Sequence, residues 1–400
     1  MATATKTTKT TTAKVKSKTT TKTSAKRKSA ALAKVQADPA LWLKNFVKII
    51  DSEGNRVPFC VNPEQKDFLN NMGRYNVILK ARQLGFSTLS LGLMLWSSHV
   101  IPASNYLMLC HDQESTQELF TRLKLMYESI PDKYRIPFRK SNEMELFLEN
   151  GSRISVKIAS KNKQLGRGFP LQIIHLSEFA FWTDEVQRRG LLSLEQALNK
   201  NPDAKIIIES TANGLNYYYE LFHKAYKGNS KYKAFFYPWY GAGAKIQFKN
   251  EIEMACDWYR HGFYQTLLSN DLTEYEKKLH DSGATLKQLT WRRWKLQDLT
   301  EQAFNQEFPS FPDEAFVSTN ECVFDTAILA QRYTYLPEYI KMEDLYQPLP
   351  DILVPYYGKN LFIYEQVRPQ EIYFGGIDTS GGLSKQGDYS AINIVDSAGQ

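Results

Sequence analysis

Short apolar runs that alternate with helix-like segments restrict the fold of this chain more than any other feature of its sequence. Such runs favour β-strands buried on both faces, because a half-exposed strand would alternate apolar and polar residues. Buried strands separated by helices are typical of a mostly parallel sheet with helices on both faces. We therefore predict an α/β fold. The predicted strands are Val77–Leu79, Tyr106–Leu109, Leu171–Leu176 and Lys205–Ile208, and the predicted helices include Thr88–His99 and Gln113–Ser129.

Other patterns surround this alternation. An Asn150-Gly151 pair between two apolar runs is the strongest short hairpin signal in the chain. The sequence turns helical beyond Trp239 and then becomes rich in proline from 309 to 369, which indicates a linker region. A domain built on the two strands after it would be marginal, so we expect an incomplete second domain. The hairpin strands are Met144–Leu148 and Arg153–Ile158, the helical region includes Leu272–Gln306, and the final strands are Ile372–Ile377 and Ala391–Val395.

The positive charge of the chain is concentrated near its N-terminus. Residues 1–38 hold ten of the 50 Lys and Arg residues but one of the 43 Asp and Glu residues, so the rest is close to neutral. They include no aromatic side chain, and we predict a disordered tail because little apolar area can offset the entropy lost on ordering. Such a tail attracts polyanions by counterion release, without reading sequence. A transit peptide is the weaker alternative, since Arg27 is the single arginine of the tail.

The sequence also bears on the compartment in which the protein works. We find no signal-peptide core and no apolar run of membrane-spanning length, which predicts a cytoplasmic protein that is not secreted. The cysteines are far apart and form no CxxC pair, so we expect buried free thiols in a reducing compartment. They are Cys60, Cys110, Cys256 and Cys322.

The segment that begins at Lys80 lies where a phosphate-binding loop is expected, between an apolar strand and a helix. Backbone N–H groups at a helix start hold phosphate oxygens, and the helix dipole favours an anion there. Gly85 permits a tight approach of the backbone, and the Ser87 hydroxyl is suited to bind Mg²⁺. Phe86 replaces the lysine that usually precedes this hydroxyl, so Arg82 or Lys80 must supply the positive charge. A plain strand–turn–helix junction is the alternative on these residues alone.

The third predicted strand ends in Ser177 and Glu178. In nucleotide-hydrolysing sheets, carboxylates at the end of such a strand hold Mg²⁺ and polarise the attacking water. We predict Glu178 as the catalytic base, while Ser177 offers a neutral hydroxyl. His175 is predicted to be a core histidine with satisfied hydrogen bonds. The rival acids Asp184 and Glu185 are interpreted as the start of the next helix, where carboxylates suit the dipole.

Two further segments carry candidate residues. Arg167 is flanked by glycines and could sense phosphate or contact DNA, although a solvated loop is the alternative. The segment Ile206–Gly214 is a strand that ends in small polar residues. There Ser210 and Thr211 could hydrogen-bond the attacking water or reorient Glu178. An ordinary strand exit into an Asn-Gly turn is the alternative for this segment.

The string ARQLGFST, with NPEQK upstream, resembles the nucleotide-binding segments of phage large terminases, whose deviant P-loop begins with Arg-Gln. The resemblance implies that Gln65 reads the adenine and that Arg82 supplies charge to the phosphates. Phe86 departs from the family's commonest loop, and Ser177 stands where the family usually has Asp. The implied nucleotide-binding residues are Gln65, Lys80, Arg82, Gln83, Gly85, Ser87 and Thr88, with Ser87 and Glu178 at the Mg²⁺ ion.

Later segments resemble the same family in the same order. Ser210 and Thr211 fall in a strand similar to the terminase coupling motif, which links hydrolysis to domain movement. The segment Phe304–Phe316 resembles the stretch after the ATPase core. The run that begins GGIDTSGG resembles the start of the terminase nuclease, an RNase H-like fold that delivers acids to two metals. Asp378 would be its first metal ligand and a catalytic residue, and Asp388 a second ligand.

The resemblance thus implies a large terminase subunit with a P-loop ATPase domain of the ASCE type at 39–310, a linker at 311–370 and an incomplete nuclease domain at 371–400. It would use ATP and Mg²⁺ to move viral double-stranded DNA into a procapsid. The complete protein would also cut DNA with two Mg²⁺ or Mn²⁺ ions, whereas this chain, without the later acids, is not expected to. The implied partners are viral DNA, the portal protein, the small terminase subunit and further copies in a ring, in the host-cell cytoplasm and without a membrane. A helicase-like ATPase and a non-hydrolysing packaging scaffold are the alternatives.

Overall fold

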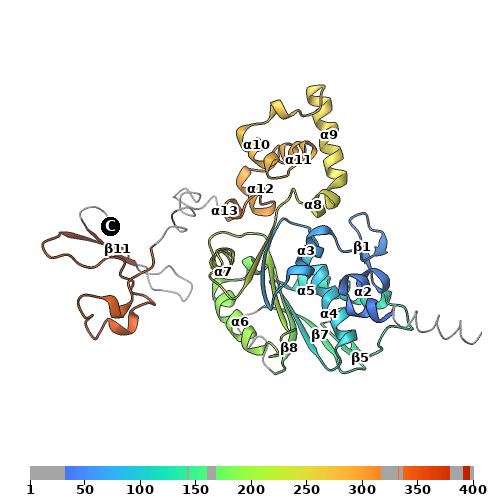
Figure 1. The fold of residues 1–400 in the computed structure, drawn as a ribbon, viewed down its shortest axis with the longest axis horizontal. Coiled ribbons are helices and arrows are strands. Elements are labelled where there is room, and N and C mark those ends of the chain that lie inside the picture. The colour runs from blue at the N-terminus through green and yellow to red at the C-terminus, as the bar shows by residue number, and fades with distance from the viewer. Residues whose placement is uncertain are drawn as a thin grey trace, which may run out of the picture. The chain divides into compact units, whose positions relative to one another are not determined.

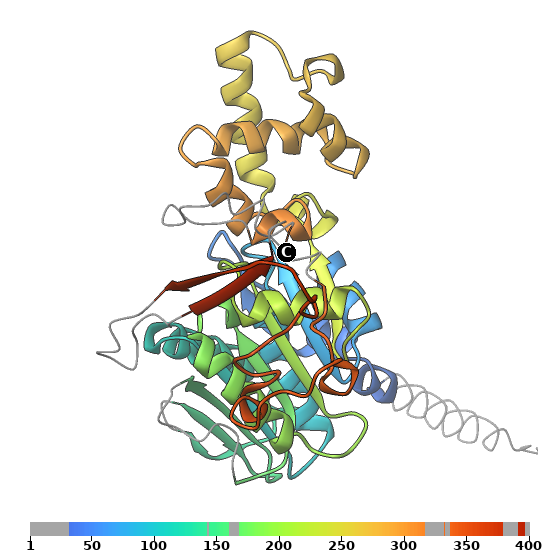
Figure 2. The ribbon, with the colours of Figure 1, turned by 90° about the vertical axis from the view of Figure 1, so that its left-hand side faces the viewer.

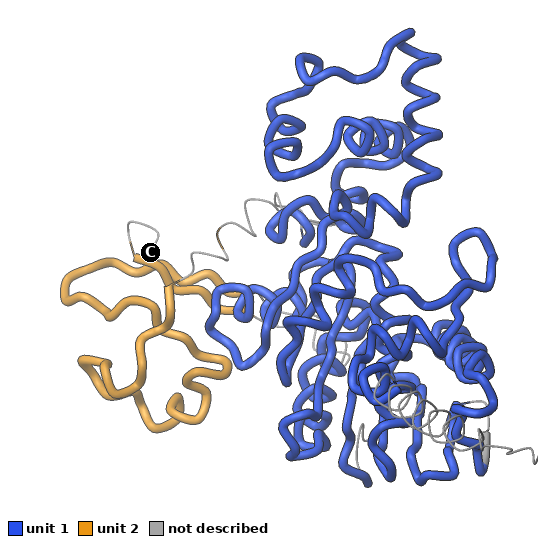
Figure 3. Tube along the Cα trace, turned by 45° about the vertical axis from the view of Figure 1, so that its right-hand side comes forward, with its two compact units in different colours: residues 1–330 blue, residues 331–400 orange. Residues whose placement is uncertain are grey.

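The computed structural model describes residues 32–141, 144–159, 168–316, 332, 337–378 and 391–396. The chain divides into two compact units, residues 1–330 and residues 331–400 (Figure 3). Among the described residues, no helix combines the length and the apolar character that crossing a membrane requires.

A sheet of eight strands forms the centre of the first unit's described part (Figure 1). Its strands are β3 (Tyr75–Lys80), β4 (Asn105–Cys110), β5 (Phe138–Ser141), β6 (Glu145–Leu148), β7 (Arg153–Ile158), β8 (Leu171–Ser177), β9 (Lys205–Ser210) and β10 (Lys233–Tyr237). They lie in the order β10-β3-β9-β8-β4-β7-β6-β5. Neighbours from β10 to β7 are parallel, and β7, β6 and β5 are antiparallel. The predicted mostly parallel sheet and the predicted hairpin are both confirmed.

Two pairs of helices cover the two faces of this sheet (Figure 1). The strands contribute side chains to a hydrophobic core on each face of the sheet. Ile78 packs in one core, and Val77 and Leu79 pack in the other. The pleat of a strand sends successive side chains to opposite faces, so a strand covered on both sides needs a continuous apolar run. One pair is α4 (Phe86–Val100) with α5 (Gln113–Ser129), and the other is α6 (Asp184–Ala197) with α7 (Tyr217–Tyr226).

The start of α4 depends on Gly85 at the loop predicted to bind phosphate. Gly85 has φ +72°, a left-handed conformation that glycine adopts without strain. A Cβ atom at this position would lie 2.9 Å from Gln65 Nε2, so a larger residue would force that side chain to move. The helix follows at once with Phe86, earlier than the start predicted at Thr88.

A helical lobe, residues 242–307, follows β10 and matches the helical pattern predicted beyond Trp239. It stands at one end of the sheet in both ribbon views (Figure 1, Figure 2). Its core is aromatic, because the Trp291 ring stacks on Phe248 at 5.1 Å and lies 5.6 Å from Trp239 and 5.8 Å from Phe304. The helices are α8 (Ala242–Gln247), α9 (Lys249–Phe263), α10 (Glu274–Asp281), α11 (Leu286–Lys295) and α12 (Glu301–Glu307).

The described chain begins with a helical segment where we predicted a disordered tail. Residues 32–37 are helical, and Leu32 and Val35 pack against the core of the first unit. The Trp96 indole also donates to the Gln36 carbonyl at 2.9 Å. The tail prediction therefore extends too far, and residues 1–31 lie outside the described residues. The elements that follow are α2 (Pro39–Phe46), β1 (Lys48–Ile50), β2 (Arg56–Pro58) and α3 (Pro63–Asn71).

The cysteines within the described ranges are free thiols, but they are not all buried. Cys110 is buried in β4, as predicted. Cys256 is half-buried, and Cys60 is exposed just after β2, so the predicted burial is wrong for Cys60. Cys322 lies outside the described residues.

The second unit contains the two strands predicted near the end of the chain. β11 (Tyr373–Asp378) pairs antiparallel with β12 (Ala391–Asp396). Apolar side chains on both strands are exposed, including Phe374, Ile377 and Ile392. An RNase H-like domain remains a prediction for this part. The first unit ends, in its described part, with α13 (Pro312–Ala315) and Phe316, whose ring lies 5.0 Å from that of Tyr219.

Candidate active site

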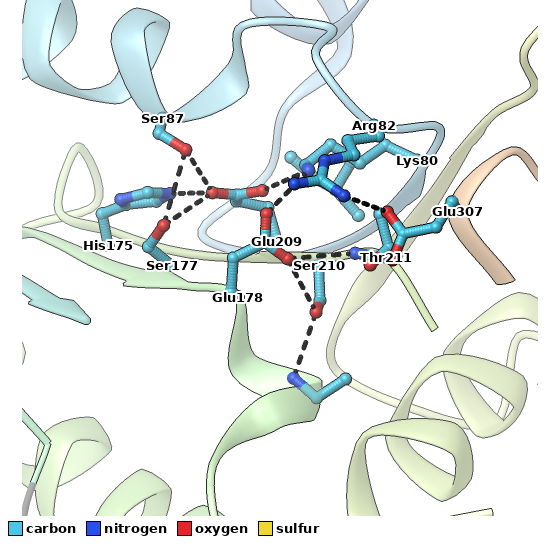
Figure 4. A network of polar contacts seen from close by, with 12 residues as sticks. Lys80, Arg82, Ser87, His175, Ser177, Glu178, Glu209, Ser210, Thr211 and Glu307 are labelled. Atoms are coloured by element: carbon cyan, nitrogen blue, oxygen red, sulfur yellow. Dashed lines mark hydrogen bonds and ion pairs between the residues drawn. The ribbon is translucent and has the colours of Figure 1, made fainter. Parts of the chain in front are cut away.

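Three neighbouring parallel strands end at the edge of the sheet that carries the predicted phosphate loop, and the side chains at their ends form a polar network (Figure 4). Lys80 is the last residue of β3, Glu178 follows β8, and Glu209 lies near the end of β9. Parallel strands bring their carboxyl ends to one edge of a sheet, where ligands of α/β proteins bind. The three side chains therefore meet although they are distant in the sequence. Because β9 lies between β3 and β8, the acidic strand β8 is not the direct neighbour of the strand that leads into the loop.

Lys80 is buried and makes two ion pairs. Its Nζ lies 3.1 Å from Glu178 Oε1 and 3.1 Å from Glu209 Oε2. Burial alone lowers the pKa of Lys80, but the two carboxylates outweigh that effect and hold the pKa above its ordinary value. Lys80 therefore carries a positive charge at neutral pH where β3 enters the loop.

Glu209 is fully buried among polar partners. Its Oε1 accepts hydrogen bonds from Ser87 Oγ at 2.7 Å and from Ser177 Oγ at 3.0 Å. His175 Nε2 lies 3.4 Å from the same oxygen. Burial raises the pKa of the Glu209 carboxyl, but Lys80 and His175 outweigh it, so the pKa is lowered and Glu209 is ionised.

Sequence reasoning misses Glu209 and misassigns its neighbour His175. A signal for Glu209 is present, since one carboxylate follows Ile206–Ile208 in an apolar run and a buried charge needs partners. His175 is buried, as predicted, but its hydrogen bonds are not satisfied. Neither of its ring nitrogens makes a hydrogen bond among the described residues, and Nε2 faces Glu209. The register of β8 and β9 explains why Glu209 and His175 meet. Ser177 is the register partner of Glu209, and His175 lies on the same face of β8 as Ser177.

Glu178 has a backbone conformation that is rare outside glycine. Its φ is +48°, at the turn between β8 and the 3₁₀ turn η1 (Phe179–Phe181). A non-glycine residue in this conformation raises the free energy of the folded state by about 1–3 kcal/mol. It persists where surrounding contacts hold it, often at functional sites. Here Oε2 accepts hydrogen bonds from Ser210 Oγ at 3.2 Å and from the Thr211 N–H at 3.3 Å. The residues predicted for coupling therefore hold the carboxylate predicted as the base.

Arg82 lies outside this cluster. Its side chain is largely exposed, and Nη1 lies 3.3 Å from Glu307 Oε2 at the end of α12. The loop backbone also bonds to the residues that end β10 and α12. The Ala81 N–H donates to the Tyr237 carbonyl at 2.9 Å, and the Arg82 N–H donates to the Glu307 carbonyl at 2.8 Å. Of the two cations considered for the phosphates, the structure brings Lys80 to the carboxylates and leaves Arg82 on the lobe.

Phe86 is a packing residue, as its apolar ring requires. It is buried, its ring stacks on Tyr237 at 5.0 Å, and it meets Phe68 at 5.8 Å. An ammonium group in this environment would lose its hydration without gaining a partner. The position that carries a lysine in the commonest form of the loop therefore serves the core in this chain.

Comparison with known proteins identifies the family. Residues 77–300 match the family model described as terminase large subunit, T4likevirus-type, N-terminal, over more than half of the chain. This chain belongs to the large terminase subunit family. The ATPase domain of the Thermus phage P74-26 large terminase is 16% identical with a TM-score of 0.43, over 62% of this chain and 92% of that chain. The large terminase of bacteriophage HK97 is 14% identical with a TM-score of 0.46, over 90% of this chain and 67% of that chain.

In this terminase, Gln65 holds the backbone of the loop. Its Nε2 donates to the Leu84 carbonyl at 3.2 Å and to the Gly85 carbonyl at 2.9 Å. Asn62 Nδ2 donates to the same Leu84 carbonyl at 3.1 Å, and Asn62 and Gln65 form the capping box that begins α3. The predicted contact of Gln65 with adenine stays a prediction.

Three further residues predicted from the resemblance are Gln83, Thr88 and Ser210. Gln83 adopts φ +64° in the loop, and Thr88 Oγ1 accepts a hydrogen bond from Arg122 at 3.4 Å. Ser210 Oγ accepts from the Ala180 N–H at 3.2 Å, which ties β9 to the turn after β8. The nucleotide-binding and coupling roles of these residues stay predictions.

The rival acids belong to the first turn of α6, as predicted. Asp184 accepts from the Tyr217 N–H at 3.0 Å and pairs with Arg188 at 2.8 Å. Glu185 pairs with Arg189 at 2.8 Å. These partners are surface residues of α6 and the start of α7, which is the structural role expected of helix-start carboxylates.

The predicted nuclease residues remain untested. Asp378 ends β11, where its backbone pairs with Ala391, but its side chain lies outside the described residues. Asp388 and Arg167 also lie outside them. Within the described ranges, no group of three or more His, Cys, Asp and Glu side chains is arranged to hold a metal ion.

Proposed function

We propose that this chain is an ATPase that drives viral double-stranded DNA into a procapsid. The observation that carries the proposal is the buried Lys80 between the carboxylates of Glu178 and Glu209, beside the loop that begins α4. A cation, a helix N-terminus and acids at adjacent strand ends are the parts that phosphoryl transfer requires. Membership of the large terminase subunit family supports the same function.

Lys80 and Glu178 have separate roles in this chemistry. Lys80 stabilises the charge that develops on the transferred phosphoryl group, because electrostatic stabilisation supplies most of the catalysis in this reaction. Glu178 orients and polarises the attacking water as the general base. Ser210 and the Thr211 N–H hold Glu178 through Oε2, which fixes the direction of Oε1.

The reaction implies Mg²⁺, and the residues present fit this ion. Magnesium prefers oxygen ligands. The hydroxyls of Ser87 and Ser177 lie 3.4 Å apart, and each donates to Glu209 Oε1. A bound Mg²⁺ would neutralise charge on the phosphate oxygens beside these groups. Ser87 and Glu178 are the contacts predicted from the sequence.

The wider functions follow from the family resemblance. We propose that the complete protein cuts the genome with a two-metal nuclease to which Asp378 and Asp388 contribute. It would work in the host-cell cytoplasm, docked on the portal protein of a procapsid, with the small terminase subunit and further copies in a ring. Nucleotide contacts of Gln65, Gln83 and Thr88 belong to the same proposal.

The test is ATP hydrolysis and DNA packaging by the purified protein, with and without DNA and matched procapsids. We expect hydrolysis that increases with DNA and procapsids, together with uptake of DNA into a nuclease-protected form. ATP binding without turnover under packaging conditions would favour the non-hydrolysing scaffold. Turnover accompanied by strand separation, without DNA uptake, would favour the helicase-like ATPase.

A further inference from the structure

The metal side of this site lacks an acid where one is expected. In P-loop NTPases, Mg²⁺ is held by the Ser or Thr of the loop together with an aspartate at the end of the acidic strand. Ser87 supplies the hydroxyl, but β8 ends in Ser177, which carries no charge. The acid that follows, Glu178, points to Lys80 and to Ser210 and does not contact Ser87 through any hydrogen bond in the described structure.

A different strand brings a carboxylate to this position. Glu209 Oε1 accepts the Ser87 hydroxyl at 2.7 Å, and it lies 3.0 Å from the Ser177 hydroxyl. Ser177 and Glu209 are register partners on adjacent parallel strands, so their side chains lie on the same face of the sheet. A carboxylate carried by residue 177 would therefore occupy nearly the same space as the present Glu209 carboxylate.

We propose that Glu209, on β9, takes the place of the missing acid of β8 and acts with Ser87 on the metal–nucleotide complex. The inference rests on the proposed ATPase function and adds one residue to it. The shorter side chain of Ser177 leaves room for the longer glutamate from the neighbouring strand. His175 Nε2 lies 3.4 Å from Oε1, the same oxygen that accepts the Ser87 and Ser177 hydroxyls.

The contacts of Glu209 exceed those of a simple counterion for Lys80. Lys80 contacts Oε2 alone, and it already has a second carboxylate in Glu178. The other oxygen, Oε1, takes the Ser87 and Ser177 hydroxyls and faces His175. A carboxylate that only neutralised Lys80 would need none of the contacts at Oε1. A carboxylate that acts on the metal–nucleotide complex together with the loop hydroxyl needs the contact with Ser87.

The experiment measures how Mg²⁺ concentration controls binding of a fluorescent ATP analogue to the purified chain, without requiring turnover. We expect Glu209→Gln to shift this Mg²⁺ dependence to about ten- to a hundredfold higher concentration, the size of effect typical for groups that support a metal ligand. Ser177→Asp alone should weaken binding, because two carboxylates would share one place. The double variant Ser177→Asp/Glu209→Gln should recover most of the wild-type Mg²⁺ dependence.

The matched control is Glu276→Gln, which removes a buried glutamate paired with Arg293 at 2.7 Å in the helical lobe. It should lower the melting temperature and leave the Mg²⁺ dependence unchanged. A folded Glu209→Gln variant with the wild-type Mg²⁺ dependence would overturn the inference and leave Glu209 as a counterion. If Glu209→Gln does not fold, the double variant decides alone: recovered Mg²⁺ dependence supports the inference, and its loss overturns it. A wild-type chain that binds no nucleotide with Mg²⁺ would instead overturn the proposed function, and this inference with it.

Discussion

A single buried ammonium group contacts both carboxylates of the candidate site. Lys80 forms ion pairs with Glu209, which is fully buried, and with Glu178, which is partly exposed. Removing one partner of a buried ion pair typically costs about 3–5 kcal/mol, because the remaining charge loses both water and partner. Lys80 therefore matters for stability and for catalysis, and an experiment must measure the two separately.

Lys80→Ala should lower steady-state ATP hydrolysis by about a hundredfold or more, the loss typical when one stabilising donor is removed. Arg82→Ala should keep most of the activity, because its surface ion pair with Glu307 contributes only about 0–1 kcal/mol. Nucleotide affinity and melting temperature are measured in parallel, to separate lost chemistry from lost folding. An inactive, folded Arg82→Ala beside an active Lys80→Ala would return the phosphate role to Arg82, as the family resemblance implies.

Glu178→Gln should leave ATP-analogue binding near the wild-type value and lower turnover by about 10²–10⁴-fold, the usual contribution of a general base. The neutral amide keeps the shape of the side chain but cannot accept the proton. The control is Asp184→Asn, which alters an exposed acid at the start of α6. Wild-type turnover in Glu178→Gln together with a dead Asp184→Asn would show that the acidic strand is assigned to the wrong residues.

Residues of the site could be predicted from the sequence only where their place beside an apolar strand or helix identifies them. Glu178 is recognisable because it follows an apolar strand, and Ser87 because it stands at the start of the helix after the loop. The choice between Lys80 and Arg82 depends on side-chain direction, which no local pattern contains. Glu209 depends on which strand lies next to which, and His175 on the register that turns it toward Glu209.

At the scale of elements, the apolar runs predict the strands well, and the helix Gln113–Ser129 is predicted to the residue. The position of β9 between β3 and β8 does not follow from those runs, because a parallel strand can join the sheet on either side of an earlier one. The helix at 32–37 is not predicted for a related reason. Its formation depends on contacts of Leu32 and Val35 with residues distant in the sequence, and not on its own composition.

Phe86→Lys tests the packing of the element that begins at the phosphate loop. We expect the free energy of unfolding to fall by about 3 kcal/mol or more, since the change removes a buried ring and buries an unpaired charge. Phe86→Leu is the control and should cost less than Phe86→Lys, because it leaves a small cavity but buries no charge. Chemical denaturation measures both. A stable Phe86→Lys with faster ATP hydrolysis would mean that a lysine at this position reaches the phosphates, contrary to the packed position of the ring beside Tyr237.

At the scale of the whole molecule, the positive charge is concentrated at the start of the sequence. Residues 1–31 contain nine of the basic residues and no acidic residue. Residues 32–37, by contrast, contribute apolar contacts to the first unit. Deletions that end before and after this helix therefore distinguish an electrostatic role of the tail from a structural one.

Deleting residues 1–31 should weaken non-specific binding to double-stranded DNA and flatten its dependence on salt. Each phosphate neutralised contributes a slope of roughly −0.9 in the plot of log affinity against log salt, so a few lost contacts are visible. Deleting residues 1–38 should have the same effect on the slope and also lower the melting temperature, because Leu32 and Val35 are lost. Binding is measured by titration at several salt concentrations. An unchanged slope after either deletion would assign DNA binding to the rest of the chain alone.

The backbone hydrogen bonds from Ala81 to the end of β10 and from Arg82 to the end of α12 have a thermodynamic consequence. Any ligand that reshapes the loop must either keep these bonds, and move the end of α12 with the loop, or break them. The orientation of the lobe and the affinity of the loop are then linked quantities, and linkage is reciprocal. An antibody fragment that fixes the lobe would change nucleotide affinity by the same factor by which nucleotide changes the affinity for that fragment.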